Sequence, residues 1–502
     1  MPTLCKHSPQ QLQSQTLWFK SLTEGMINQG RQLLRSKFIR DTLVLQAGKF
    51  SLILLSLISS VLVWRLLGPE RAGIFALGES LVGVWQSLDL SGVGTSTSVS
   101  LSIAIGARDE AAILDLMAFY VKISLMINVV LTVLIWLLGM PIANTFYGGD
   151  TRIVTIAVLL SVASLADGLY GLVTIALRSR RSMRSFALLQ NANQFVLTSC
   201  VIVAVLIRPQ PESLAVGRLV YSYTTLVLAY VVYQRRRTHG QISYPTIRAI
   251  FTRALSVSPR PYWRFGIANA IDKNVTSLFV QIPLQLVGAR AGAQAVGYLD
   301  LAMSGITQAS TLTSAVLDNM QAVVPQAVGR RDYAGLWRNF RRVLVIMTMV
   351  SLLLYGAMAL VAPFLIPPVL GSRWIPAIPP LVILTFYGAI TTVGGNFSPL
   401  YRSFNLMRQT IIVKLIALAL VMPLGFLLMR PLFAGYGSLD SFIGFASLMP
   451  GELHSSAGAV VGAWMIDAIY GLSIALTAVV TLPELRRRAQ QRPAAADQRL
   501  NS

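Results

Sequence analysis

The stretch "RLLGPERAGIFAL", Arg65–Leu77, decides the fold because a related stretch, "VGARAGAQAVGYLDL", Val287–Leu301, follows it at a fixed distance. Gly73-Ile74-Phe75 aligns with Gly297-Tyr298-Leu299 at an offset of 224 residues. Four more landmarks keep the offset at 222 or 223: "GARDEA" with "GRRDYA", Pro141 with Pro363, Gly148 with Gly371, and Arg208-Pro209 with Arg430-Pro431. The chain therefore carries two copies of one structural unit.

The composition is that of a membrane protein. The 502 residues are 54% hydrophobic and only 12% charged, whereas soluble domains carry about 25% charged residues. A helix of roughly 20 apolar residues crosses the hydrocarbon core of a bilayer. We predict an all-α polytopic protein with about twelve transmembrane spans, at residues 43–66, 73–104, 114–138, 153–177, 185–207, 213–233, 265–287, 295–323, 343–366, 376–400, 409–429 and 457–482.

The basic residues predict the orientation of these spans. If the N-terminus is inside, 30 of the 42 lysines and arginines lie in inner segments, 8 at outer span ends and four within spans. This bias places both termini in the cytoplasm. The net charge of +22 is then a topology signal rather than a sign of nucleic-acid binding. The inner basic turns are expected to contact anionic membrane lipids.

Five segments follow from this topology. Residues 1–42 form a basic cytoplasmic tail that can include an interfacial helix, 43–233 an N-terminal lobe, 234–264 a cytoplasmic inter-lobe loop, 265–482 a C-terminal lobe, and 483–502 a second basic tail. Each lobe has six spans and the same orientation, so the repeats are parallel. Two parallel six-helix lobes around a central cavity are a transporter architecture.

Enzyme chemistry is not indicated. Gly48-Lys49 resembles the end of a phosphate-binding loop, but that loop requires glycine where Leu43 stands and Ser or Thr where Phe50 stands. The two cysteines and three histidines have no metal-site or disulfide spacing. We expect no enzymatic activity and no cofactor, with transport driven by an ion gradient or the membrane potential.

The quoted opening motif, followed by "LDLSGVGTSTSVSLSIAIGARDEAAI" (Leu88–Ile113), resembles the polysaccharide and oligosaccharide flippases of the multidrug/oligosaccharidyl-lipid/polysaccharide exporter superfamily. Ser91 stands where those proteins usually have a D-L-G run, and the N-terminal tail is unusually long. The resemblance implies two V-shaped lobes and the movement of undecaprenyl-diphosphate-linked repeat units to the periplasmic leaflet. It also implies that polysaccharide polymerase and chain-length proteins are partners in the same pathway.

Lys49 and Lys273 are the predicted substrate-binding residues. The repeat offset joins them, so the first helix of each lobe carries a lysine at matching depth. In the resembling architecture those helices line the cavity, where two ammonium groups suit a diphosphate. Two alternatives remain open: either lysine can snorkel to the headgroups, and Lys273 can pair with its neighbour Asp272.

Acidic residues inside spans are candidates for ion coupling. Asp167 lies deepest, and Glu79 and Asp467 are further candidates. A desolvated carboxylate can carry a proton, although each of these acids can equally be a hydrogen-bonded packing residue. Lys122 and Lys414 are interpreted as snorkelling residues.

The alternative function is a cation-coupled multidrug exporter of the same superfamily. That class favours acidic and aromatic cavity walls, whereas matched lysines repel cationic substrates. A membrane scaffold without transport activity is disfavoured by the parallel repeat.

Overall fold

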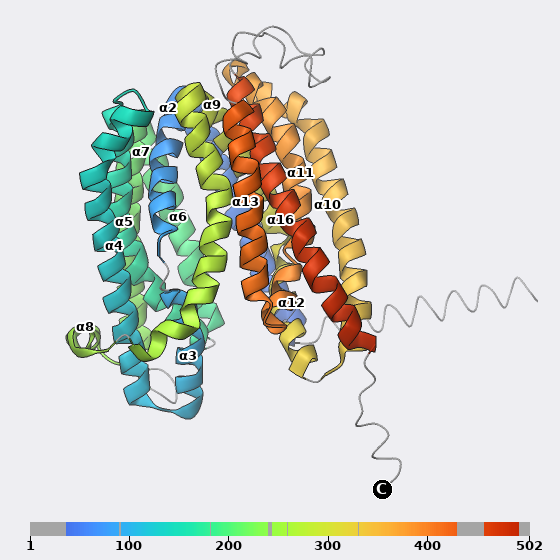
Figure 1. Cartoon of the computed structure of the whole chain (residues 1–502). Coiled ribbons are helices and arrows are strands. Elements are labelled where there is room, and N and C mark those ends of the chain that lie inside the picture. Colours follow the sequence, from blue (N-terminus) through green and yellow to red (C-terminus); the bar gives the residue numbers. More distant parts are fainter. Residues whose placement is uncertain are drawn as a thin grey trace, which may run out of the picture. The chain divides into compact units, whose positions relative to one another are not determined.

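The computed structural model describes residues 37–89, 92–180, 182–238, 243–258, 260–329, 331–428 and 456–490. These residues form helices and short connections, and none of them lies in a β-strand (Figure 1). The chain divides into two compact units, Met1–Leu55 and Ser56–Ser502. The described part of the first unit is a single helical segment that starts at Lys37. The second unit holds every other described helix.

The helices follow one another along the chain with short connections. Their bounds are α2 Lys37–Gln86, α3 Val93–Ala107, α4 Glu110–Phe146, α5 Thr151–Ser179, α6 Met183–Ile207, α7 Pro211–Arg236, α8 Ile247–Ser256, α9 Arg260–Gly329, α10 Tyr333–Leu370, the 3₁₀ helix η1 Ser372–Ala377, α11 Ile378–Gly394, α12 Phe397–Ser403, α13 Met407–Leu428 and α16 Ala457–Gln490.

Eight described segments are long and apolar enough to cross a membrane. They coincide with the third to sixth and ninth to twelfth predicted spans, and the other four predicted spans fall on α2, α3 and α9. The prediction of an all-α polytopic membrane protein is therefore confirmed.

The second predicted span, 73–104, is not one continuous helix. α2 ends at Gln86 and α3 begins at Val93, after Gly92 in a left-handed conformation with φ of 54°. Glycine adopts this conformation without steric cost. The repeat-equivalent positions hold Ala315 and Val316, and there α9 continues as one helix to Gly329. The break thus distinguishes the two halves.

The backbone repeats with the sequence. α2 bends at Gly68 (φ 73°, ψ 171°) and α9 bends at Gly292 (φ 84°, ψ 174°), a conformation open essentially to glycine alone. Arg108 and Arg331 both adopt positive φ, 57° and 59°. Each is followed by an aspartate whose side chain accepts a hydrogen bond from the first turn of the next helix, as an N-cap should. Structural landmarks therefore recur at the sequence offset.

α2 and α9 cross backbone to backbone at the repeated glycines. A Cβ atom on Gly73 would overlap the carbonyl oxygen of Ala293 and the amide nitrogen of Gly297. A Cβ atom on Gly297 would overlap the carbonyl oxygen of Pro69 and crowd the amide nitrogen of Gly73. Pro69 and Ala293 are themselves 224 residues apart. The contact is reciprocal, as a two-fold pseudo-axis requires.

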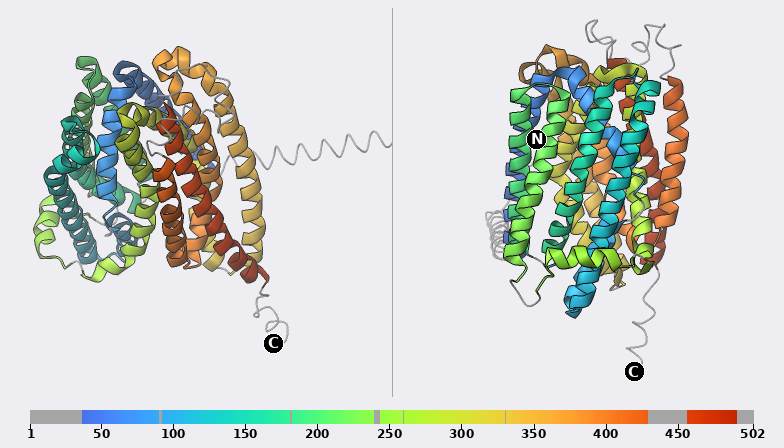
Figure 2. Two further views of the ribbon diagram at one scale, coloured as in Figure 1. Left: turned by 45° about the horizontal axis from the view of Figure 1, so that its top comes forward. Right: turned by 90° about the vertical axis from the view of Figure 1, so that its left-hand side faces the viewer.

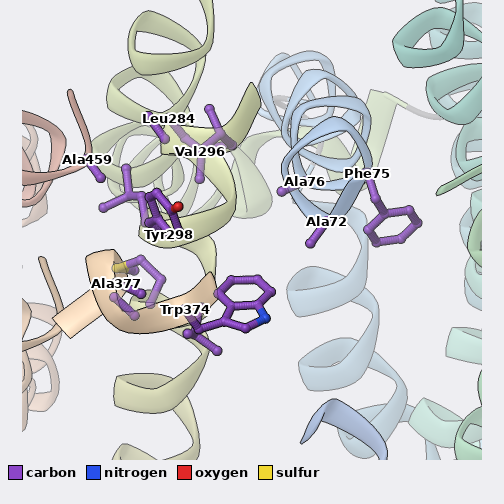
Figure 3. Close-up of a cluster of buried hydrophobic side chains, with 14 of the residues drawn as sticks. Ala72, Phe75, Ala76, Leu284, Val296, Tyr298, Trp374, Ala377 and Ala459 are labelled. Carbon is purple, nitrogen blue, oxygen red and sulfur yellow. The ribbon is translucent and has the colours of Figure 1, made fainter. Parts of the chain in front are cut away.

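The remaining long helices form two groups. α3, α4, α5, α6 and α7 pack on one another, and α10, α11, α13 and α16 pack on one another and on α9 (Figures 1 and 2). Between the groups lies a hydrophobic core built from the second part of α2, the bend of α9 and η1. There Tyr298 and Trp374 meet edge to face at 6.2 Å (Figure 3), and the Trp374 indole donates to the Trp64 carbonyl at 3.2 Å.

The short helix α8 lies in the expected inter-lobe loop and is bound to α4 by an ion pair and two hydrogen bonds. Arg253 pairs with Asp115 at 2.5 Å, and the Lys122 ammonium donates to the carbonyls of Leu255 (3.3 Å) and Val257 (3.0 Å). A cation at a helix C-terminus is stabilised by the helix dipole and the unpaired carbonyls. Lys122 therefore caps α8, which corrects its interpretation as a snorkelling residue.

The glycine crossing makes a testable prediction. Gly73→Ala should lower stability by about 1–3 kcal/mol or more, because the new methyl group meets backbone atoms that cannot rotate away. Gly356→Ala is the matched control, since its Cβ meets nothing within 4 Å and alanine favours a helix by up to about 1 kcal/mol. The thermal unfolding midpoints of the two purified variants are measured, with size-exclusion chromatography as the readout of folded protein. Equal midpoints for the two variants would contradict the reciprocal contact.

Candidate functional site

The first part of α9 presents different faces to the two halves of the protein. Asn274 donates to the Asp89 carbonyl at 2.6 Å, and Gln285 donates to the Leu77 carbonyl at 3.1 Å. On the opposite face, Asp272 and Thr276 contact the C-terminal helices. Successive helical residues differ by roughly 100°, so Lys273 lies on a flank between these two faces. Its side chain is exposed.

Asp272 is the centre of a buried ionic network. Its side chain is 3% exposed and accepts from the Lys414 ammonium of α13 at 2.5 Å and from the Tyr401 hydroxyl of α12 at 3.0 Å. Arg402 lies 3.5 Å from the same carboxylate, and Lys414 also donates to the Thr276 hydroxyl at 2.8 Å. A buried carboxylate is tolerated when its charge is paired and its oxygens are hydrogen-bonded.

This network corrects the sequence-based interpretation of Lys414 and excludes one proposed partner of Lys273. Asp272 pairs with Lys414 rather than with its neighbour Lys273, and Lys414 reaches into the protein rather than toward the headgroups. Lys273 forms no ion pair with the part of the chain that the structure describes. Sequence reasoning missed this pairing, although two opposite charges in apolar spans are a signal for it.

Lys49 can be placed only in outline. It belongs to the helical backbone of α2, but its side chain lies outside the described residues. Lys49 also belongs to the first compact unit and Lys273 to the second. The pairing of the two lysines across a cavity stays a prediction.

Glu79 and Asp167 lie beside Arg218, one of the eight basic residues that the sequence places at outer span ends. Arg218 of α7 pairs with Glu79 of α2 at 2.6 Å. Asp167 of α5 is exposed, and Ser222 and Arg218 of α7 lie near its carboxylate. Asp300 of α9 lies close enough to Glu79 and Arg218 for electrostatic interaction with both. Glu79 thus pairs with Arg218, and Asp167 and Asp300 lie near the pair. Asp300 is a member of this group that the sequence did not single out.

Asp467 has a different environment. Its side chain on α16 is buried, and neither carboxyl oxygen has a hydrogen-bond partner among residues of known placement. Tyr387 of α11 lies beside it, and the Tyr387 and Tyr470 rings meet at 4.7 Å. The Tyr470 hydroxyl donates to the Thr276 carbonyl at 3.3 Å. A row of polar groups therefore runs from Asp467 to the Asp272 network.

Comparison with known families decides the classification. Residues 62–379, more than half of the chain, match the family model described as "Polysaccharide biosynthesis protein". The chain belongs to the polysaccharide biosynthesis protein family. The matched region includes both glycine bends, the crossing of α2 and α9, and Lys273. No match was found among curated protein sequences.

Solved structures show the fold of this polysaccharide biosynthesis protein. An inward-facing multidrug resistance MATE family transporter of the MOP superfamily superposes with a TM-score of 0.65 at 15% identity, covering 89% of this chain and 99% of that one. The eukaryotic MATE transporter AtDTX14 gives 0.60 at 14% identity, covering 91% and 100%. A Pyrococcus furiosus MOP superfamily transporter, for which reversed pocket polarity suggests a different function, gives 0.56 at 16% identity, covering 92% and 98%. The chain has the fold of a MOP superfamily transporter.

The Asp272 network predicts an asymmetric response to mutation. Asp272→Asn leaves the Lys414 ammonium buried without its counter-charge, which should cost about 3–5 kcal/mol. Replacing both partners, as Asp272→Leu with Lys414→Met, should restore most of that loss because neither charge then needs a partner. Thermal unfolding midpoints of the purified variants measure the effect.

Arg487→Ala is the control for this experiment. It breaks a pair with Glu484 in which Arg487 is 69% exposed, and exposed pairs contribute about 0–1 kcal/mol. An Asp272→Asn midpoint equal to that of Arg487→Ala would contradict the buried pair.

Proposed function

We propose that this polysaccharide biosynthesis protein is a flippase. It moves undecaprenyl-diphosphate-linked oligosaccharide repeat units, of the O-antigen, exopolysaccharide or capsule type, from the cytoplasmic to the periplasmic leaflet by alternating access. Both termini face the cytoplasm of the bacterial inner membrane in this proposal. The family match and the MOP transporter fold support a transporter associated with polysaccharide synthesis.

The observation that carries the substrate proposal is the available charge of Lys273. Asp272 would neutralise this lysine if it were free to do so, but Lys414, Tyr401 and Arg402 occupy its oxygens. An exposed ammonium group held on a rigid helix is suited to a diphosphate, whose oxygens accept charge-assisted hydrogen bonds. Lys49, the repeat-equivalent residue, is proposed as the second cation.

The substrate proposal predicts a graded response to charge. Lys49→Ala and Lys273→Ala should each cripple glycan export in cells, because losing a charge partner costs on the order of 2 kcal/mol, more than tenfold in affinity. Arginine should retain part of the export, and glutamate should be worst because it repels phosphate. Complementation of an export-deficient strain, normalised to membrane protein level, is the measurement.

Arg208→Ala is the control for charge removal at an exposed site, and it should export normally. Near-normal export by the Lys49→Ala/Lys273→Ala double variant would overturn the cationic-site proposal. Loss of cationic-dye efflux in place of glycan export would favour the multidrug exporter.

We further propose that transport is proton-coupled and that Asp467 is the proton carrier. An ionised carboxylate buried without a counter-charge costs several kcal/mol, so the group binds a proton while the site is closed. Tyr387 lies beside it, and the Tyr387 ring packs against that of Tyr470. The charges that α9 and α13 bring to this interior, Asp272 and Lys414, neutralise each other. Opening of the site to water would release the proton.

Infrared spectroscopy tests this protonation directly. Asp467→Asn should remove the carbonyl stretch of a protonated carboxylic acid from the neutral-pH spectrum of the purified protein. Glu79→Gln is the control: Glu79 is paired with Arg218, and the band should survive this substitution. A band unchanged by Asp467→Asn would show that Asp467 carries no proton at neutral pH.

A further inference from the structure

The end of the N-terminal half that carries α8 is at the lower left of Figure 1. A cavity of about 190 Å³ opens at this end. It lies where α5 ends, α6 begins, α7 ends and the chain leads into α8. Its polar lining consists of Arg180, Ser182, Tyr233, Arg236, Arg237 and Tyr244. Ala176 and Leu177 complete it, so no acidic side chain among the described residues lines this cavity. None of its lining residues is one of the acids or lysines of the proposed transport site.

Two tyrosines form a rigid wall. The rings of Tyr233 and Tyr244 stack at 6.1 Å with an interplanar angle of 15°. The Tyr244 hydroxyl donates to the Ala176 carbonyl at 2.8 Å, and the Tyr233 hydroxyl donates to the Pro245 carbonyl at 2.8 Å. Burial raises the pKa of Tyr244 to about 12, so this hydroxyl stays protonated and adds no negative charge. The wall is therefore fixed and neutral.

Arg180 is held in place by backbone and ring contacts. Its guanidinium donates to the Arg236 carbonyl at 2.9 Å and the Arg237 carbonyl at 3.3 Å, and it lies 5.0 Å over the Tyr244 ring. Carbonyls at a helix C-terminus and an aromatic face both stabilise a cation. These contacts fix the guanidinium of Arg180 at the cavity wall.

Further positive potential converges on the same space. The side chains of Arg236 and Arg237 line the cavity and form no ion pair within the described part of the chain. α6 starts beside it, and the side chain of its N-cap residue, Ser182, makes no capping hydrogen bond. The first N–H groups of α6 therefore receive no capping bond from Ser182, and they carry the positive end of the helix dipole. Three arginines and a helix N-terminus gather around one neutral-walled cavity.

We infer that this cavity binds a phosphate group, either in the headgroup of an anionic phospholipid or as free inorganic phosphate. Arginine forks and helix N-termini are both suited to phosphate oxygens. The cavity has room for roughly six water-sized groups, which accommodates a phosphate with a short substituent. A bound anion also relieves the repulsion among the guanidinium groups. This inference does not depend on the proposed transport substrate.

The test compares the Arg236→Gln/Arg237→Gln double variant with Arg235→Gln, a neighbouring exposed arginine that does not line the cavity. Purified proteins are placed in phosphatidylcholine nanodiscs, with inorganic phosphate titrated against potassium chloride of equal ionic strength. A second set of nanodiscs contains phosphatidylglycerol. Thermal unfolding midpoints and native mass spectrometry report binding, independently of any flippase activity.

We expect a ligand-dependent rise in the midpoint for the wild type and for Arg235→Gln, and at least about tenfold weaker binding for the double variant, because charge-assisted hydrogen bonds are lost. A response to inorganic phosphate identifies free phosphate as a ligand. A response to phosphatidylglycerol alone identifies the lipid headgroup. The inference is overturned if neither ligand shifts the wild type, or if Arg235→Gln loses as much binding as the double variant.

Discussion

The contact between Gly73 and Gly297 is the constraint on which the rest of the structure depends. Each glycine stands where a Cβ atom would overlap the backbone of the other helix, so α2 and α9 approach as closely as two helices can. Small residues permit this approach in membranes, where packing rather than water drives helix association. The bends at Gly68 and Gly292 return each helix across the bilayer. One pseudo-symmetric crossing therefore organises both halves.

The interior charges do not follow the repeat that the glycine crossing follows. The two halves repeat in backbone but not in ionic partners. The C-terminal half buries Asp272 against Lys414, whereas the N-terminal half places Glu79 and Arg218 in a more exposed pair. Neutralising Asp272 from α13 leaves Lys273 charged on the flank of α9. In the proposed function, this buried pair leaves Lys273 as the lysine of α9 that meets the substrate, although the pair's own contribution to stability is small relative to an apolar replacement.

Much of the fold could be predicted from the sequence, because apolar run length and repeat spacing are local properties. The glycines and N-cap aspartates at repeated positions have the same roles in both halves. The break before α3 was missed because Gly92 lies in a run whose apolar pattern continues through it. The partners of Asp272, Glu79 and Lys122 were missed because each lies on a helix distant in sequence. Ion pairing depends on helix rotation, which a single sequence does not specify.

The central claim is that this MOP-type fold moves an anionic lipid-linked glycan. Its most direct test is transport by the purified protein in liposomes that contain an undecaprenyl-diphosphate-linked oligosaccharide and carry an imposed proton gradient. An impermeant glycan-cleaving enzyme outside the liposomes measures the fraction of glycan on the outer leaflet over time. We predict gradient-dependent transfer by the wild type that protein-free liposomes do not show. Transfer no faster than in protein-free liposomes, at full reconstitution of folded protein, would contradict the account.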